Sequence, residues 1–207
     1  MARCLVSGFA VLLMAACSAS SPPGGQTSDC GLSSPVAGPL VPVSPSAQMV
    51  SWSCSGITFS YPIGWYRTTE SFPSSFTDMV AAVSNQPVHD PCAVSGNSIT
   101  CGQPLDSLEP GGLLIEWWED GFPQWSIASQ PGTPTTVAGL QARLQAASAP
   151  GSECPTDLGA DTSINVVIAR TVSNNYYEFV ACIRGPETNI QVSTAMAILH
   201  SVEFAYP

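Results

Sequence analysis

The sequence predicts an α+β domain in which an antiparallel sheet of about six to seven strands packs against a C-terminal helix. Three observations predict this fold. Several short runs alternate apolar and polar residues, an asparagine-rich turn joins two of these runs, and a helical pattern lies near the end of the chain. The chain has 207 residues, of which 44% are hydrophobic, so it can bury a core. We therefore expect a sandwich of two to three layers.

The first three expected strands lie at 57–61, 78–84 and 113–119. Run 57–61 alternates apolar with small polar residues, and run 78–84 is a short apolar stretch of strand length. Run 113–119 has the clearest alternation in the chain. Because successive side chains of a strand point to opposite faces, Trp117 would enter the core and Trp118 would lie on the other face.

Three further strands are expected at 135–147, 163–171 and 176–184. The Ala, Leu, Gln and Arg content of 135–147 is compatible with a helix. Its Thr-Thr-Val start followed by Gly139 favours a strand with a bulge, and we expect the strand. The other two runs are joined by Ser-Asn-Asn at 173–175, which predicts a hairpin because Asn tolerates left-handed backbone conformations.

A helix is expected at 187–201, directly after Pro186 ends the preceding strand. Its apolar stripe consists of Ile190, Ala195, Met196, Leu199 and Val202. A helix that follows antiparallel strands with such a stripe is expected to lie across one face of their sheet.

Residues 1–16 are expected to be a signal peptide. Arg3 precedes an apolar run at 5–16 that would span ~18 Å as a helix, well short of the ~30 Å core of a membrane. The following Leu-Met-Ala-Ala-Cys at 13–17 resembles the lipobox of bacterial lipoproteins, apart from Met14 where Leu is usual. The resemblance implies that Cys17 carries a diacylglyceryl group and becomes the first residue after cleavage. The alternative is an ordinary signal peptide that leaves Cys17 as a free thiol.

Residues 17–50 are expected to be the lipidated cysteine and a tether, and residues 51–207 the folded domain. The segment 18–50 contains six prolines, four glycines and eight serines but a single charged residue, Asp29. Such a composition buries too little apolar surface to offset the entropy of folding. We therefore expect an irregular spacer that lifts the domain away from the outer face of the bacterial cytoplasmic membrane.

The chain has eight cysteines, of which Cys4 lies in the expected signal peptide and Cys17 in the lipobox. The six that remain suit three disulfides, for which fifteen pairings exist. The short Gly-, Ser- and Asn-rich loop between Cys92 and Cys101 predicts one bridge. Cys154 and Cys182 form a second plausible pair, and Cys30 with Cys54 follows by elimination. A zinc site is the alternative, but it lacks the C-x₂-C spacing.

Charge excludes one class of partner. Fifteen acidic residues against five arginines and no lysine give a formal charge of −10, which becomes −11 when Arg3 leaves with the signal peptide. Nucleic acid would be repelled by this surface, so we expect none as a partner. Anionic lipid would be repelled as well, which is a physical reason for a spacer.

Three segments resemble one family. ITFSYPIGW at 57–65 is similar to the opening strand and Pro-x-Gly-Trp corner of PsbP-like domains, VAGLQA at 137–142 to their middle strand, and AILHSVEF at 197–204 to their C-terminus. The resemblance implies an antiparallel sheet flanked by helices and kinship with the LpqN-type lipoproteins of actinobacteria. Members of that group act mostly as binding or assembly proteins, which implies that this chain is not an enzyme.

The candidate ligand contacts are Trp118, Phe122 and Trp125, in the segment EWWEDGFPQW at 116–125. A tryptophan flanked by acids can stack on a sugar ring or on a cationic group. The alternative, which we favour, is that a helix covers this face of the sheet and makes Trp117 and Trp118 both core residues. Glu116, Glu119 and Asp120 are candidate calcium ligands, but they lack the D-x-D-x-D spacing.

The function expected from the sequence is that of a lipid-anchored, exported, non-enzymatic binding or scaffold protein of the cell envelope, without a cofactor or metal. Its partner would be the membrane through Cys17, together with an envelope protein, a lipid or a glycan. One alternative is a carrier of an apolar or cell-wall ligand. Another is an exported hydrolase that uses the loop of His89 and Asp90, near Ser95 and Ser98, although no G-x-S-x-G motif is present.

Overall fold

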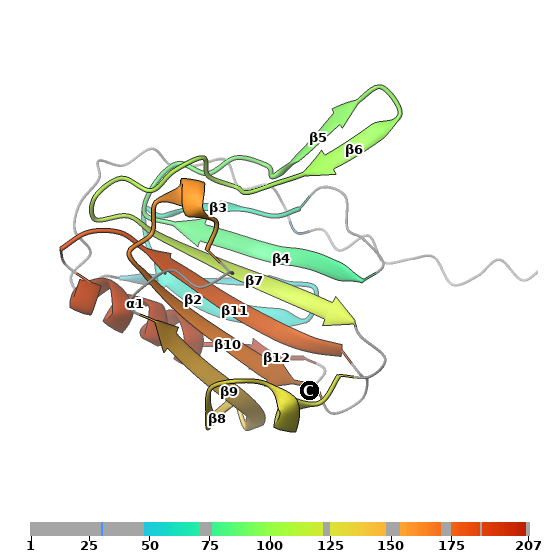
Figure 1. Ribbon diagram of the computed structural model, residues 1–207, viewed down its shortest axis with the longest axis vertical. Helices are drawn as coiled ribbons and strands as arrows, with labels where there is room; N and C mark the ends of the chain where they lie inside the picture. Colours follow the sequence, from blue (N-terminus) through green and yellow to red (C-terminus); the bar gives the residue numbers. More distant parts are fainter. Residues whose placement is uncertain are drawn as a thin grey trace, which may run out of the picture.

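The computed structural model describes residues 30, 48–70, 76–121, 125–147, 154–170, 175–186 and 188–205. These residues form a seven-stranded sheet, a three-stranded sheet, a two-stranded hairpin, an α-helix and two short 3₁₀ helices (Figure 1). All strand pairs are antiparallel. The predicted α+β class is therefore confirmed.

The seven-stranded sheet is the centre of the fold. Its strands, in spatial order, are β3 (Tyr66–Thr68), β4 (Thr77–Ser84), β7 (Leu113–Gly121), β11 (Asn175–Ile183), β10 (Thr162–Ala169), β9 (Leu140–Ala147) and β8 (Thr133–Val137). The strands predicted at 78–84, 113–119, 163–171 and 176–184 all belong to it, with ends that differ by at most two residues. β10 and β11 are paired neighbours, as the predicted hairpin requires.

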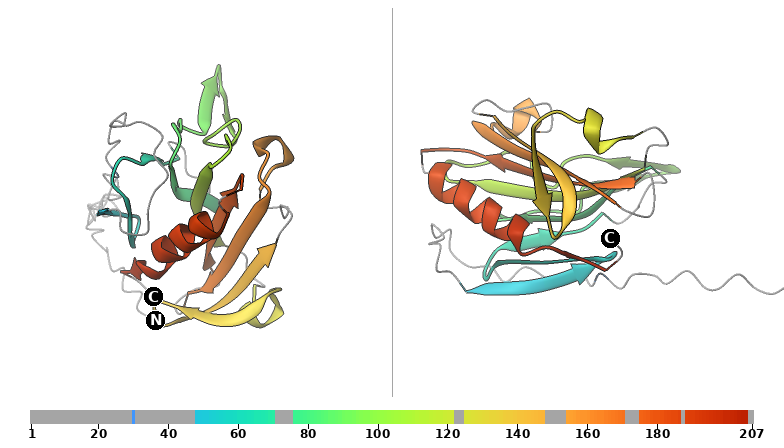
Figure 2. Two further views of the ribbon diagram at one scale, coloured as in Figure 1. Left: turned by 90° about the vertical axis from the view of Figure 1, so that its left-hand side faces the viewer. Right: turned by 90° about the horizontal axis from the view of Figure 1, so that it is seen from below.

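One face of this sheet, the inner face, is covered by two elements. α1 (Thr188–His200) lies beside the three-stranded sheet of β1 (Met49–Cys54), β2 (Ile57–Pro62) and β12 (Glu203–Phe204) (Figure 2). The predicted helix is confirmed. The run 57–61 is a strand as predicted, but it pairs with β1 and β12 and not with the large sheet, a partnership set by non-local contacts.

Aromatic rings fill the space between the two sheets. Phe59 from β2 lies 5.7 Å from Trp117 of β7, measured between ring centroids. Trp117 also contacts Phe179 at 4.9 Å and Phe204 at 6.4 Å, both edge to face. The Trp117 and Phe59 side chains are fully buried. The inner core thus ties β7 and β11 to the small sheet, as the alternation in 113–119 predicts for Trp117.

The segment 135–147 corrects one prediction. It is two strands, β8 and β9, and not one strand with a bulge at Gly139. Ala138 and Gly139 both have positive φ, 48° and 82°, and these two residues form the turn. A two-residue hairpin turn of type I′ needs positive φ at both central positions, and Gly139 adopts its value without steric cost.

The disulfides Cys30–Cys54, Cys92–Cys101 and Cys154–Cys182 join the cysteines in the predicted pairs. Cys92 and Cys101 close the base of a hairpin, β5 (Cys92–Ser95) and β6 (Ser98–Cys101), which projects from the body of the domain (Figure 1). Cys154 and Cys182 are almost completely buried. Three disulfides indicate an oxidising, extracytoplasmic location.

The start of the domain lies slightly before the predicted boundary. β1 begins at Met49, inside the segment 17–50 expected to be a tether, and Cys30 from that segment is bonded to Cys54 at the end of β1. Cys17 lies outside the described residues. Within the described ranges, no helix combines the length and the hydropathy needed to cross a membrane.

The ring contacts of Phe59 make it a test of the inner core. Phe59→Ala should lower the free energy of unfolding by about 3–5 kcal/mol, because a fully buried ring is replaced by a cavity. Phe76→Ala is the matched control, since the Phe76 side chain is 66% exposed. Urea unfolding followed by circular dichroism measures both changes. Equal effects of the two substitutions would contradict the core assignment.

Exposure predicts the order in which the disulfides are reduced. Cys101 is exposed, whereas Cys154 and Cys182 are 2% and 1% exposed. A mild thiol reductant should open Cys92–Cys101 well before Cys154–Cys182, because exchange requires access of a thiolate to a sulfur atom. Alkylation at successive times followed by peptide mass mapping measures the order. Reduction of Cys154–Cys182 first would contradict the buried position of that bridge.

Candidate functional site

The face of the large sheet opposite α1, called here the outer face, is covered over part of its area by loops. A second apolar cluster lies there, beneath the segment that contains η2 (Thr156–Leu158). It consists of Met79, Ala82, Leu108, Leu114, Cys154, Leu158, Ala160, Val180 and Cys182, with Val88, Leu105 and Trp118 packed at its border. The expectation that a helix covers this face is wrong, because the described helix α1 lies on the inner face (Figure 2).

Beyond this apolar cluster the outer face is acidic and aromatic. β7 presents Glu116, Trp118 and Asp120, which share a face because their spacing is two. β11 adds Tyr176 opposite Asp120 and Glu178 opposite Trp118. These five residues, Glu116, Trp118, Asp120, Tyr176 and Glu178, are called the outer-face cluster.

Glu116 lies deepest in the cluster and is 2% exposed. Its Oε1 has no hydrogen-bond partner among the described residues. The pKa of Glu116 is raised to about 7. Burial is the main cause, a hydrogen bond from the Trp118 side chain lowers the pKa in part, and the charge of Glu178 adds to the rise. The carboxyl group is thus held inside the protein with a hydrogen bond from Trp118, while its Oε1 lacks the donor that would help to stabilise a buried charge.

Glu178 is held by an amide. Asn165 of β10, 6% exposed, donates from Nδ2 to Glu178 Oε1. Arg143 shares this face two strands away, because Val167 pairs with both Glu178 and Arg143. Its guanidinium donates to the carbonyls of Ile127, Ala128 and Gly132, each at 3.3 Å. That cation is therefore engaged by the η1 (Ile127–Ser129) segment.

Asp120 and Tyr176 form the other end of the cluster. Burial raises the pKa of Asp120, which is 4% exposed, and the charges of Asp78 and Glu119 add to the rise, while a hydrogen bond with Thr77 lowers it. Burial also raises the pKa of Tyr176 to about 12, with contributions from Asp120 and Glu178. The negative charges of the cluster therefore disfavour one another.

The three predicted contact residues have different outcomes. Trp118 is half-buried on the outer face, so it is neither a core residue like Trp117 nor fully exposed. Trp125 stacks on Tyr176 with ring centroids 4.6 Å apart and an interplanar angle of 12°, which places it beside the cluster. Phe122 lies outside the described residues. Whether Trp118 and Trp125 contact a ligand stays a prediction.

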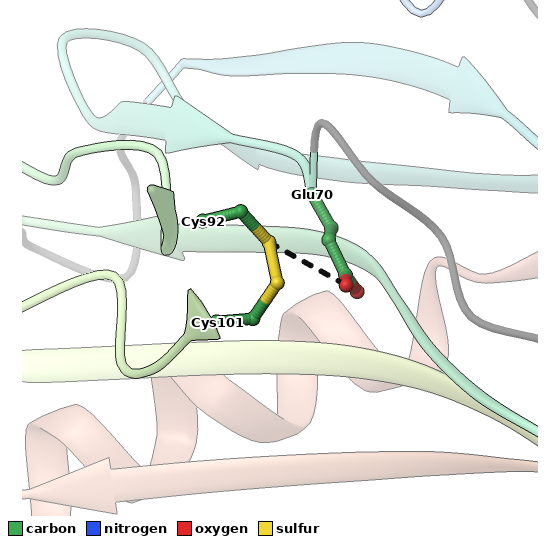
Figure 3. Close-up of side chains that lie close together, drawn as sticks. All are labelled: Glu70, Cys92 and Cys101. Atoms are coloured by element: carbon green, nitrogen blue, oxygen red, sulfur yellow. Dashed lines mark hydrogen bonds between the residues drawn. A yellow bond between two sulfur atoms is a disulfide. The ribbon is translucent and has the colours of Figure 1, made fainter. Parts of the chain in front are cut away.

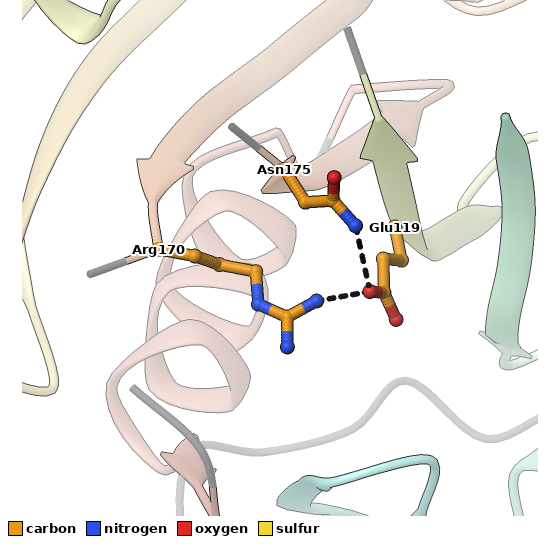
Figure 4. Close-up of polar contacts among 3 residues, drawn as sticks. All are labelled: Glu119, Arg170 and Asn175. Carbon is orange, nitrogen blue, oxygen red and sulfur yellow. Dashed lines mark hydrogen bonds and ion pairs between the residues drawn. The ribbon is translucent and has the colours of Figure 1, made fainter. Parts of the chain in front are cut away.

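The three candidate calcium ligands, Glu116, Glu119 and Asp120, do not come together in the structure. Glu119 points to the inner side of β7, where Arg170 pairs with it and Asn175 Nδ2 lies 3.5 Å from the same oxygen, Oε1 (Figure 4). Arg170 also lies over the Tyr177 ring, 4.9 Å from its centroid. Glu116 and Asp120 are on the opposite face, so the three carboxylates do not converge.

A second acidic group lies against a disulfide. Glu70 Oε1 is 3.5 Å from Cys92 Sγ, and Cys101 lies beside them (Figure 3). Both sulfur atoms are in one disulfide, so neither is a thiolate that binds a metal. Glu70 Oε2 accepts a hydrogen bond from the Met79 backbone N–H at 2.9 Å, which gives this carboxylate a structural role. Burial raises the pKa of Glu70, and the charges of Asp78 and Asp90 add to the rise.

The His89 loop leads into the β5–β6 hairpin. His89 and Asp90 are exposed. Asp90 Oδ1 accepts a hydrogen bond from the Cys92 backbone N–H, and the His89 backbone N–H donates to the Pro104 carbonyl. These contacts shape a turn at the base of the β5–β6 hairpin.

The sequence patterns did not predict a place in the site for Glu178, Tyr176 and Asn165. A signal for two of them was present, because Tyr176 and Glu178 share one face of the predicted strand 176–184, and an acid there is unusual among β-branched and aromatic residues. Asn165 gave no such signal, since its role depends on pairing between β10 and β11.

The raised pKa of Glu116 predicts how stability depends on pH. The folded protein binds this proton more tightly than the unfolded chain, so the free energy of unfolding should fall as pH rises from about 4.5 to about 7. Glu116→Gln should remove this decrease, which is on the order of 2–3 kcal/mol by the relation between pKa and free energy. Urea unfolding at a series of pH values measures it.

The control for this experiment is Glu203→Gln, which removes an exposed carboxylate of β12. It should leave the fall in stability between pH 4.5 and 7 in place. A wild-type stability that rises across this window, or that Glu116→Gln does not change, would show that Glu116 is not a buried, uncompensated acid.

No protein-family model matches this chain, and no curated protein matches it.

Proposed function

We propose that this protein is a lipid-anchored, exported, non-enzymatic binding or scaffold protein of the bacterial cell envelope. The observation that carries the proposal is the use of the cysteines. The three disulfides engage six of the eight, which leaves Cys4 and Cys17. Cys4 lies in the expected signal peptide, so Cys17 is the single thiol of the expected mature chain. That thiol stands at the end of the lipobox-like motif.

The disulfide between Cys30 and Cys54 limits how far the domain stands from the anchor. Twelve residues, 18–29, separate Cys17 from Cys30. An extended chain of this length reaches about 40 Å at ~3.1 Å per residue. The end of the domain near Cys54 would therefore stay within this distance of the membrane.

A binding role is supported by the outer-face cluster, in which a buried carboxyl oxygen of Glu116 lacks a partner among the described residues. Kinship with PsbP-like domains of the LpqN type is part of this proposal, on the strength of the sequence resemblance. A non-enzymatic role is in keeping with the exposed His89 turn. The proposal includes no cofactor.

Removal of the Cys17 thiol tests the anchor. Cys17→Ser expressed in a lipoprotein-processing bacterium should move from the membrane fraction to the soluble fraction, because the mature chain loses its acyl chains. The measurement is fractionation after a high-salt wash, with detergent phase partition of the same samples. Mass spectrometry of the wild-type protein should show a diacylglyceryl group on an N-terminal Cys17.

Cys4→Ser is the matched control, because it removes the other cysteine outside the disulfides and should leave the protein membrane-bound. Retention of Cys17→Ser in the washed membrane fraction would refute lipid anchoring through this residue.

A further inference from the structure

We propose that the outer-face cluster binds a guanidinium or ammonium side chain presented by a basic segment of a partner protein. Glu116 and Glu178 would supply the negative charge, and the Trp118 ring would supply an aromatic face. This inference gives a partner class to the binding role proposed above and rests on it.

The first support is an excess of negative charge. Glu116, Asp120 and Glu178 place three carboxylates on the outer face, and each of the four arginines among the described residues contacts groups outside the cluster. Arg170 pairs with Glu119 on the inner face, and Arg143 is held by three backbone carbonyls. Arg184 donates to the Leu108 carbonyl, and Arg67 lies over the Trp52 ring at 4.8 Å.

The second support is independent of net charge. Glu116 Oε1 is an acceptor without a donor in the described part of the chain, and the residue is 2% exposed. A buried polar atom that lacks a partner costs free energy that the fold must tolerate. A cationic donor brought in by a partner would satisfy this oxygen and offset the repulsion between Glu116 and Glu178.

The third support is the neighbouring aromatic surface. Trp118 pairs in register with Glu178 on β11 and with Met79 on β4, and its side chain forms a hydrogen bond with the Glu116 carboxylate. Tyr176 and the Trp125 ring stacked on it extend this surface. An aromatic face next to carboxylates favours a guanidinium or ammonium group, because the cation interacts with both.

A metal ion fits the cluster less well. A hard cation requires several oxygen ligands close to one another. Among the described residues, the group of three whose potential ligand atoms lie within 4.8 Å of one another is Glu70, Cys92 and Cys101, which is elsewhere and includes a disulfide. The carboxylates of the outer-face cluster are spread along two strands, which suits a planar guanidinium or a long ammonium side chain.

The experiment uses the full-length lipidated protein in detergent and a pentapeptide, Gly-Arg-Gly-Arg-Gly. The peptide in which citrulline replaces both arginines has nearly the same shape without the charge. Calorimetry and tryptophan fluorescence at low salt measure binding. We expect the arginine peptide to bind and the citrulline peptide not to bind. Glu116→Gln and Glu178→Gln should each weaken binding by about tenfold or more, as for desolvated charge pairs.

Glu203→Gln is the matched control, since it removes one negative charge from the small sheet and leaves the cluster intact. It should change the dissociation constant of the arginine peptide less than twofold. This is small beside the tenfold change, ~1.4 kcal/mol, expected for the cluster variants. Circular dichroism and urea unfolding show whether the Gln variants remain folded. Glu178→Gln provides a second variant if Glu116→Gln disturbs the sheet.

Three results would overturn the proposal. Equal weakening of peptide binding by Glu203→Gln and Glu178→Gln would show that the peptide responds to the overall charge of the protein and not to the outer-face cluster. Equal binding of the citrulline peptide would show that charge is not recognised. Free arginine that binds as tightly as the peptide would argue against a partner segment. Membrane fractionation and the peptide titration test the two proposals separately. If the protein binds the arginine peptide but is not anchored through Cys17, only the anchoring proposal is refuted. If the protein is anchored but does not bind the peptide, only the proposed binding site is refuted.

Discussion

The packing of Trp117 against Phe59, Phe179 and Phe204 is the interaction on which the rest of the structure depends. It joins the centre of the seven-stranded sheet to the small sheet, and it fixes which face of β7 is buried. Because side chains alternate along a strand, a β7 that buries Trp117 must place Glu116 and Trp118 on the opposite face. The apolar inner core therefore determines the position of the acidic outer-face cluster.

The buried charges of the outer face lower the stability of the fold, whereas the aromatic packing of the inner face raises it. Burial, with repulsion from neighbouring carboxylates, disfavours the charges of Glu116 and Asp120, and Oε1 of Glu116 lacks a donor among the described residues. Such local cost is tolerated because the inner core and the disulfides stabilise the same strands; Cys182, for example, lies on β11 in line with Tyr176 and Glu178. A fold with this additional stability can maintain a surface of uncompensated charges, which the proposed partner would neutralise on binding.

Local patterns predicted the central strands and the helix, because alternation and an amphipathic stripe are properties of short segments. The disulfide pairs were also predictable, since loop composition and an even count restrict them. The sheet partners of β2 were not predictable, because pairing with β1 and β12 depends on distant residues. β1 was hidden at the end of a proline- and serine-rich segment, and the Ala138-Gly139 turn lacked the Asn or Asp that often marks a hairpin.

At the site, the outer-face position of Trp118 was predicted from alternation along its strand. Its combination with Glu178 and Asn165 was not predictable, because it depends on the register of three strands.

The most direct test of this account is the pKa of Glu116, measured by ¹³C NMR of the side-chain carboxyl with and without the arginine peptide. An acid buried without a counter-charge should titrate near pH 7 in the free protein. A bound guanidinium should lower that pKa, because a neighbouring positive charge favours the ionised carboxylate. A pKa near 4.5 in the free protein, or one that the peptide leaves unchanged, would contradict the claim that the outer face holds an uncompensated acid for a cationic partner.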